Sequence, residues 1–333
     1  MESEHDNRFS RQYLNLAEER LGSVVLATTD DFFARKENLI KPGRGISLPD
    51  KFTDDGKWMD GWESRRKRIP GHDWCSIRLG APGKIRALDI DTNHFTGNFP
   101  PFASLEACEI DGDPDESTSW TELLAKSPLE GTSQNFFEIS NDLRWTHVRL
   151  HIYPDGGVAR LRVYGEPHME WSTIGADEII DLSASWHGGL ALACSDQHFG
   201  QMGNLIAPGS GINMGDGWET RRRRGPGNDW VIMRLATCGI VRKLEVDTSF
   251  FKGNFPDRCS VDAANLPATH TPQDWGNDDI EWQTLLPEQK LQADHRHFFE
   301  QELESLGGVT HLRLNIFPDG GISRFRIFGV KAG

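Results

Sequence analysis

Four consecutive basic residues stand between two tryptophans in the stretch DGWESRRKRIPGHDW, from Asp60 to Trp74. The stretch returns as DGWETRRRRGPGNDW, from Asp216 to Trp230, with eleven of its fifteen positions identical. Arginine presents a planar fork of N–H donors that fits a carboxylate, and flanking aromatic rings strengthen the attraction by excluding water. Each copy therefore predicts a cradle for a small anion. The alternative is a solvated charge run that pairs with neighbouring acids.

The candidate cradle of each copy combines one glutamate with the basic run that follows it. Its members are Glu63, Arg65, Arg66, Lys67 and Arg68 in the first copy, and Glu219, Arg221, Arg222, Arg223 and Arg224 in the second.

Two histidines occur in the first copy only. His72 and His94 are replaced by Asn228 and Phe250 in the second copy, so the shared framework cannot require them. If one copy is catalytic, the first is therefore the better candidate. Histidine suits proton transfer near neutral pH, and with Asp73 it could ligate a divalent metal, although no spacing specifies one. The alternative is a loop histidine that only forms hydrogen bonds.

Other shared residues are interpreted first as structural. Asp91 is expected to cap the loop after its strand, and GNFP at Gly97–Pro100 fixes an unusual loop path. Its Asn98 would be well placed to bind amide groups if the loop edges a pocket. A face of arginines beside the PDGG turn is interpreted as a solvent-facing or subunit-facing surface. These arginines are Arg149, Arg160 and Arg162, with Arg313, Arg324 and Arg326 in the second copy.

Strands must position these residues. In Thr146–Tyr153, apolar and polar side chains alternate with the period of two that indicates a half-buried strand, and PDGG predicts a tight hairpin to a returning strand. Short strands are also expected at Cys75–Leu79, Leu88–Asp91, Val231–Leu235 and Leu244–Asp247. The pattern predicts an all-β protein, with a two-sheet sandwich in each copy. A short N-terminal helix is expected, with Ser10 as its N-cap and Tyr13, Leu14 and Leu16 following.

The repeat sets the expected domain organisation. We expect an extension at 1–22, a first repeat at 23–165, a linker at 166–187 that packs against both domains, and a second repeat at 188–333.

Composition narrows the classes of function. The formal net charge of -14 argues against a nucleic-acid partner, and no apolar run approaches the length of a membrane helix. The N-terminus lacks the pattern of a secretory signal, so a soluble cytoplasmic protein is expected. The five scattered cysteines predict reduced, mostly buried thiols. Motifs of the common hydrolases and nucleotide-binding proteins are absent from the sequence.

The doubled motifs together resemble the allantoicase family. They are DGWE-S/T-RR-K/R-R, PG-H/N-DW, DT-x-x-F-x-GNFP and PDGG-x-x-R-x-R, and the resemblance runs from about Ser23 to Gly329. It implies two tandem jelly-roll domains of the galactose-binding-like, discoidin-related kind. It also implies hydrolysis of allantoate to ureidoglycolate and urea in purine degradation, and homo-oligomers. No cofactor is required by the sequence, and a divalent metal is compatible with it.

A site hypothesis follows from the shape of allantoate, a small carboxylate with two ureido arms. Arg65 and Arg66, or Arg221 and Arg222, would hold the carboxylate. Glu63 or His72 would activate water, and His94 would protonate the departing urea nitrogen. The remaining expected substrate-binding residues are Asp73, Trp74, Asp91, Asn98 and Asp229.

Three alternatives stay open at this point. Urea could be expelled before water adds, the protein could be a non-catalytic tandem carbohydrate-binding module, or it could hydrolyse a related ureide.

Overall fold

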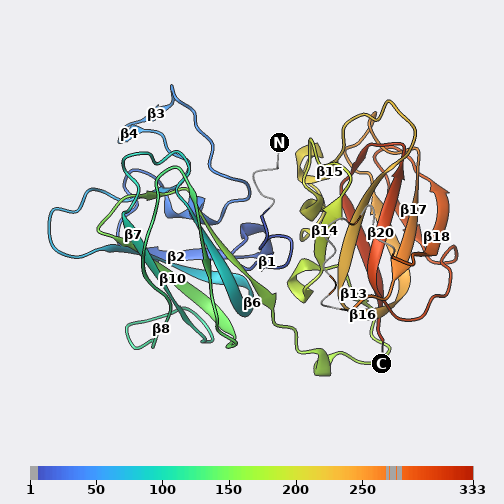
Figure 1. The fold of residues 1–333 in the computed structure, drawn as a ribbon, viewed down its shortest axis with the longest axis horizontal. Coiled ribbons are helices and arrows are strands. Elements are labelled where there is room, and N and C mark those ends of the chain that lie inside the picture. Colours follow the sequence, from blue (N-terminus) through green and yellow to red (C-terminus); the bar gives the residue numbers. More distant parts are fainter. Residues whose placement is uncertain (1–6, 268–269, 271–274, 276–279, 333) are drawn as a thin grey trace. The chain divides into compact units, whose positions relative to one another are not determined.

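The computed structural model describes residues 7–267, 270, 275 and 280–332 of the chain. It divides into two compact units, Met1–His168 and Met169–Gly333 (Figure 1). In the described part of the chain the helices are short 3-10 turns and the framework is β-structure. The predicted all-β tandem of sandwich domains is confirmed.

The elements of the first unit are β1 (Leu14–Asn15), η1 (Glu19–Leu21), β2 (Val24–Thr28), η2 (Lys36–Ile40), β3 (Phe52–Thr53), β4 (Gly56–Lys57), β5 (Trp62–Glu63), β6 (Asp73–Asp91), β7 (Phe102–Cys108), β8 (Thr121–Pro128), β9 (Gln134–Glu138), β10 (Trp145–Tyr153), β11 (Gly157–Val158) and β12 (Arg160–Pro167).

The elements of the second unit are η3 (Trp171–Thr173), β13 (Ile180–Asp181), η4 (Ser185–His187), β14 (Leu190–Cys194), η5 (Met202–Ile206), η6 (Met214–Asp216), β15 (Trp218–Glu219), β16 (Asp229–Asp247), β17 (Arg258–Ala264), β18 (Gln283–Lys290), β19 (Arg296–Phe299), β20 (Val309–Phe317), β21 (Gly321–Ile322) and β22 (Arg324–Lys331).

One long strand belongs to both layers of each sandwich. The first part of β6 pairs with β2 and β10, and its second part pairs with β9 and β12. The order β10-β7-β8 extends one layer, and β1 joins β12 in the other. The sequence predicted two separate strands here, at Cys75–Leu79 and Leu88–Asp91, and the structure joins them. In the second unit β16 has the same arrangement.

The core of each unit lies between these layers. Val148, Leu150 and Ile152 on β10 are completely buried, which confirms the period of two predicted for this strand. Their counterparts in the second unit, Leu312, Leu314 and Ile316, are equally buried. Each unit thus has an apolar core of its own, against which its loops are held.

The PDGG segment does not close a hairpin between paired strands. Gly156 has the positive φ that was predicted, +137°, but β10 and β12 each pair with β6 and not with one another. The segment carries the chain from one layer to the other. This part of the prediction was wrong because a turn motif specifies a change of direction and not the partner of the next strand.

Two arginines that follow this turn are buried, contrary to the surface expected for them. Arg160 is 3% exposed, and its guanidinium donates to the Asp60 carboxylate at 2.7 Å and to the carbonyl oxygen of Gly43 at 3.0 Å. Arg162 is buried and also donates to Gly43. These side chains fasten the 43–60 loop to the sandwich, and Arg324 and Arg326 do the same in the second unit.

The predicted N-terminal helix is wrong. The Asn7 side chain accepts bonds from the backbone N–H groups of Phe9 and Ser10, so this segment forms a turn. Leu14–Asn15 then pairs with the edge of β12, and only Glu19–Leu21 is helical, as a 3-10 turn. An open strand edge provides the backbone partners that a helix would have supplied internally. The first six residues of the expected extension lie outside the described residues.

Candidate active site

The doubled motifs of the first unit meet at one end of its sandwich, which we call the motif end. It comprises residues 60–73, 92–101 and 153–159. Glu63 on β5 pairs with Gly157 on β11, and the Gly157 N–H donates to the carbonyl oxygen of Asn98 at 2.8 Å. The Lys67 N–H donates to the Asp155 carboxylate at 2.7 Å. Three segments that are far apart in sequence thus form one surface.

Close packing explains why glycine and tryptophan recur in these motifs. A Cβ atom on Gly157 would lie 1.9 Å from the Phe95 ring, so only glycine allows this approach. Trp62 is fully buried, and its indole N–H donates to the carbonyl oxygen of Asp30 at 2.8 Å. Trp62 therefore anchors the start of the basic run, and its neighbour Glu63 is positioned by that anchor.

Glu63 is the acid–base candidate at the motif end. Its side chain is half-buried, and the Asn98 amide donates to its Oε1 at 2.7 Å. Burial raises the pKa of the Glu63 carboxyl, and the bond from Asn98 opposes part of that rise. The second unit repeats the pair with Glu219 and Asn254. A carboxyl of this kind can hold a proton closer to neutral pH than an exposed glutamate can.

The basic run alternates between paired and free side chains. The Arg65 guanidinium donates to the Asp30 carboxylate at 2.6 and 2.7 Å, and the Lys67 ammonium lies 2.6 Å from the carboxylate of Asp73. Arg66 and Arg68 are exposed, and within the described residues neither has a hydrogen bond or an ion pair. The free cations of the cradle are therefore the second and fourth members of the run.

The second unit has the same alternation. Arg221 pairs with Asp196 at 3.0 Å and Arg223 pairs with the buried carboxylate of Asp229, while Arg222 is exposed. A pairing that recurs in both units is part of the shared framework. Arg65 and Arg221, both expected to hold the substrate carboxylate, are thus already occupied by an internal carboxylate.

Asp73 and Asp91 are each 1% exposed. Asp73 Oδ1 accepts a bond from Thr29 at 2.7 Å besides that of Lys67. Asp91 accepts hydrogen bonds from Nε and Nη2 of Arg44, at 2.9 and 3.0 Å, and from the N–H of Asn93 at 2.8 Å, which confirms its predicted capping of the loop. The geometry gives these two carboxylates structural partners, and neither faces solvent where a ureido arm would bind.

His94 lies against the 43–60 loop. It has a φ of +68°, and its Nε2 lies 3.1 Å from the carbonyl oxygen of Gly45. The adjacent Arg44 pairs with Asp91, so the structure brings His94 and Asp91 to one loop. Phe250, at the equivalent position of the second unit, also has a positive φ of 72°.

His72 lies in a chain of polar side chains on the outer face of β10. Its Nε2 is 2.9 Å from Nδ1 of His151, and Nε2 of His151 is 3.0 Å from the Glu106 carboxylate. The sequence hypothesis missed both His151 and Glu106. One signal could have found His151, since the second copy replaces it with Asn315 just as it replaces His72 with Asn228.

Trp74 borders the same face. The guanidinium of Arg149 lies 5.4 Å from the Trp74 ring and 4.3 Å from the ring of Trp120, in cation–π geometry. Arg149 also pairs with Glu106, so it connects the aromatic side chains to the polar chain. Trp74 thus lies beside Arg149, which connects it to the side chains around His72.

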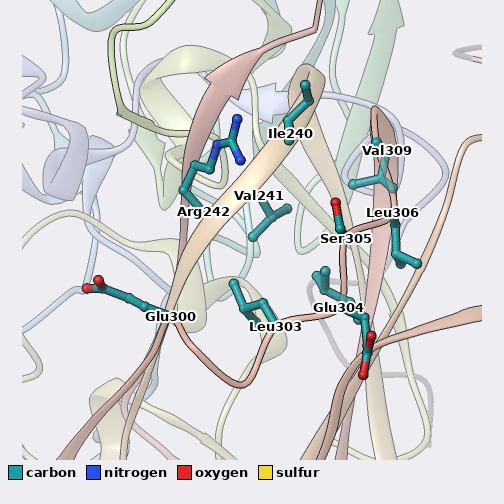
Figure 2. Close-up of a pocket in the computed structure, with 11 residues that line it drawn as sticks. Ile240, Val241, Arg242, Glu300, Leu303, Glu304, Ser305, Leu306 and Val309 are labelled. Atoms are coloured by element: carbon teal, nitrogen blue, oxygen red, sulfur yellow. The ribbon is translucent and has the colours of Figure 1, made fainter.

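A pocket of about 120 Å³ lies elsewhere, in the second unit. Figure 2 shows it between β16, which carries Ile240 and Arg242, and the 300–307 segment, which carries Glu300 and Leu303. None of the residues expected at the site lines it.

No group of three or more His, Cys, Asp or Glu residues suited to an ion occurs within the described ranges. The nitrogens Nε2 of His72 and Nδ1 of His151 face one another as hydrogen-bond partners. In the same part of the chain, no helix has the length and apolar character needed to span a membrane.

The structure defines a duplicated all-β protein whose loops carry a half-buried glutamate and exposed arginines twice. A family model described as the allantoicase repeat matches residues 14–168 and again residues 180–332. The chain belongs to the allantoicase family, which consists of hydrolases.

Named relatives and solved structures agree with this assignment. The chain is 52% identical to "Probable allantoicase 1" of Burkholderia mallei, with 96% of this chain and 95% of that protein covered. It is 54% identical to a probable allantoicase of Pseudomonas fluorescens strain Pf0-1, with 96% and 97% covered. The crystal structure of allantoicase from Saccharomyces cerevisiae has a TM-score of 0.80 and 35% identity, with 95% and 92% covered.

Proposed function

We propose that the chain hydrolyses allantoate to ureidoglycolate and urea, and that the motif end of the first unit is the site of this reaction. Membership of the allantoicase family supports the reaction. The observation that supports the site is the half-buried Glu63 carboxyl, held by Asn98 in the same motif as the free cations Arg66 and Arg68.

Each group has a role that fits its surroundings. The guanidinium groups of Arg66 and Arg68 bind the substrate carboxylate, because no carboxylate in the described part of the chain pairs with them. Asn98 orients Glu63 and contacts a ureido arm. The bond between the central carbon and one ureido nitrogen breaks, and protonated Glu63 gives its proton to the departing urea. Oxygen from water bonds to the same carbon.

Matched substitutions test the site. We expect Glu63→Gln to reduce urea release from allantoate at least about 100-fold, because proton transfer typically contributes this much. Glu219→Gln, at the equivalent position of the second unit, is expected to leave most of the activity. Equal losses in both variants would show that the two units share the reaction. A loss in Glu219→Gln alone would move the site to the second unit.

The assembly and location of the protein are also proposals. We infer a homo-oligomer located in the cytoplasm, from membership of a family of metabolic hydrolases. Sedimentation velocity at micromolar concentration tests the first inference, and a single monomeric species would contradict it. Cell fractionation tests the second, which activity confined to the medium or periplasm would contradict.

A further inference from the structure

Three side chains of the first unit form a continuous hydrogen-bonded chain on one face of a sheet. His151 on β10 lies opposite Trp74 on β6 and opposite Ser104 on β7. Glu106 is two residues beyond Ser104 on the same strand, so its side chain is on the same face. His72, which immediately precedes β6, completes the chain by reaching Nδ1 of His151 at 2.9 Å.

The carboxylate at one end determines the tautomer of each ring. Glu106 also pairs with Arg149, and as a carboxylate it only accepts hydrogen bonds. Nε2 of His151 therefore carries the proton that is donated to Glu106 across 3.0 Å. Nδ1 of a neutral His151 is then an acceptor, so Nε2 of His72 must donate to it. This leaves the lone pair of neutral His72 on Nδ1.

We propose that the Glu106–His151–His72 chain makes Nδ1 of His72 the base that takes a proton from the attacking water. The inference rests on the proposed hydrolysis of allantoate and adds the second proton-transfer group. His72 is the catalytic residue in this scheme. His151 and Glu106 are positioning residues, because they act through its ring.

The proton balance of the step is complete. Water loses one proton to His72 Nδ1 as its oxygen bonds to the central carbon of the substrate. The ring then carries protons on both nitrogens, and its positive charge is stabilised by the Glu106 carboxylate through His151. Urea leaves with the proton that Glu63 supplies, and transfer of the His72 proton back to Glu63 through solvent restores both groups.

The surroundings of His72 favour the neutral form of its ring. Burial lowers the pKa of His72, and the nearby cations Lys67 and Lys126 lower it further. The carboxylates of Asp73 and Glu106 raise the pKa of His72 and oppose that effect. The Tyr153 ring, with its centroid 4.5 Å from that of His72, covers one side of the imidazole. The pKa of His151 is lowered as well, mainly by burial.

The second unit keeps this arrangement without a group that titrates near neutral pH. The Asn228 amide lies 3.4 Å from Asn315 Oδ1, and the Asn315 amide donates to Asp262 at 2.9 Å. These residues occupy the positions of His72, His151 and Glu106. The comparison shows that asparagine fits at these places in the fold. His72→Asn and His151→Asn are therefore suitable substitutions that preserve packing.

The first experiment measures urea release and its pH profile for the full chain and its variants. His72→Asn should reduce kcat at least about 100-fold, and His151→Asn about tenfold. Asn228→Ala is the matched control, with kcat expected to be unchanged. Glu106→Gln should lower kcat and move the acidic limb of the pH profile to lower pH, because loss of the carboxylate disfavours the imidazolium. Glu106→Asp, the residue of the second unit, should restore part of the activity.

A negative result for the reaction and a negative result for the role of His72 are distinguishable. If the unmodified protein releases no urea, the proposed function fails. If it releases urea but His72→Asn retains full kcat, only the present inference is overturned. An unshifted acidic limb in Glu106→Gln would overturn the positioning role. Nitrogen-15 NMR of the histidine rings adds a readout that does not need turnover. It should show the Nε2–H tautomer for neutral His72, and the Nδ1–H tautomer would contradict the inference.

Discussion

At the scale of single residues, the position of a charge within the basic run decides what it can do. Arg65 and Lys67 point toward internal carboxylates, whereas Arg66 and Arg68 are exposed without partners within the described residues. A run of four cations therefore contributes two framework ion pairs and two cations that can bind a ligand. Sequence alone treats all four alike.

This division predicts different effects for neighbouring substitutions. Arg66→Ala should raise KM for allantoate about tenfold or more with a small change in kcat, because a charge-assisted hydrogen bond contributes about 1.5–3 kcal/mol. Arg222→Ala serves as the matched control in the second unit. Steady-state kinetics on both variants tests whether Arg66 binds the substrate. A normal KM for Arg66→Ala would remove this residue from the binding site.

Asp89 predicts a pH dependence of stability. Burial raises its pKa to about 7, and nearby Asp91 adds to the rise. When the pKa of a carboxyl is higher in the folded than in the unfolded state, its contribution to stability is fully present at a pH below the unfolded-state pKa. This contribution is lost as the pH rises toward the folded-state pKa of about 7. The free energy of unfolding of the unmodified protein, relative to that of Asp89→Asn, should fall by roughly 2 kcal/mol between pH 5 and 8.

The equivalent carboxylate of the second unit provides the control for that measurement. Glu245 pairs with Arg296 at 2.6 Å, whereas Asp89, among the described residues, accepts a side-chain hydrogen bond only from the neutral amide of Gln134, at 2.7 Å. Denaturant titrations of Glu245→Gln over the same pH range provide the comparison. A pH-independent difference for Asp89→Asn would contradict the prediction.

At the scale of elements, local patterns predicted much of the fold and long-range partners supplied the rest. The alternation of apolar and polar side chains along Thr146–Tyr153 predicted β10 correctly, because a strand with one buried face has an apolar residue at every second position. The continuity of β6, and the burial of Arg160 and Arg162, depend on segments distant in sequence. No local pattern records those partners.

The candidate site was likewise predictable only where its residues lie in local sequence motifs. Comparison of the two copies identified the shared Glu63 and the copy-specific His72, since both lie in recognisable motifs. The comparison did not identify Glu106, because the second copy has a similar residue, Asp262, at the equivalent position. Glu106 is brought close to His72 by the pairing of β7 with β10 and of β10 with β6, which the sequence does not reveal.

Packing at β11 gives a prediction at this scale. Gly157→Ala should lower the free energy of unfolding by about 1–3 kcal/mol, because the added methyl group would overlap the buried Phe95 ring. Gly97→Ala, where an added Cβ meets no atom within 4 Å, is the control and should change stability far less. Thermal and denaturant unfolding of the two variants tests the difference, and equal losses would contradict it.

At the scale of the whole molecule, charge acts on the substrate in two opposing ways. The net charge of -14 repels an anionic substrate, whereas Arg66 and Arg68 attract it locally. We expect kcat/KM to change by less than about threefold between roughly 50 and 300 mM salt. In the Arg66→Ala, Arg68→Ala double variant only the repulsion remains, so kcat/KM should rise with salt. A fall with salt in that variant would contradict this account.

The long strand β6 has a consequence for how the first unit opens. Because Asp73–Arg78 pairs in one layer and Ala87–Asp91 in the other, neither layer can separate without removing a strand from its neighbour. The two sheets should therefore be a single cooperative unit in native-state hydrogen exchange. Amides at both ends of β6 would exchange with the same free energy of opening, and the sandwich would have no weaker half.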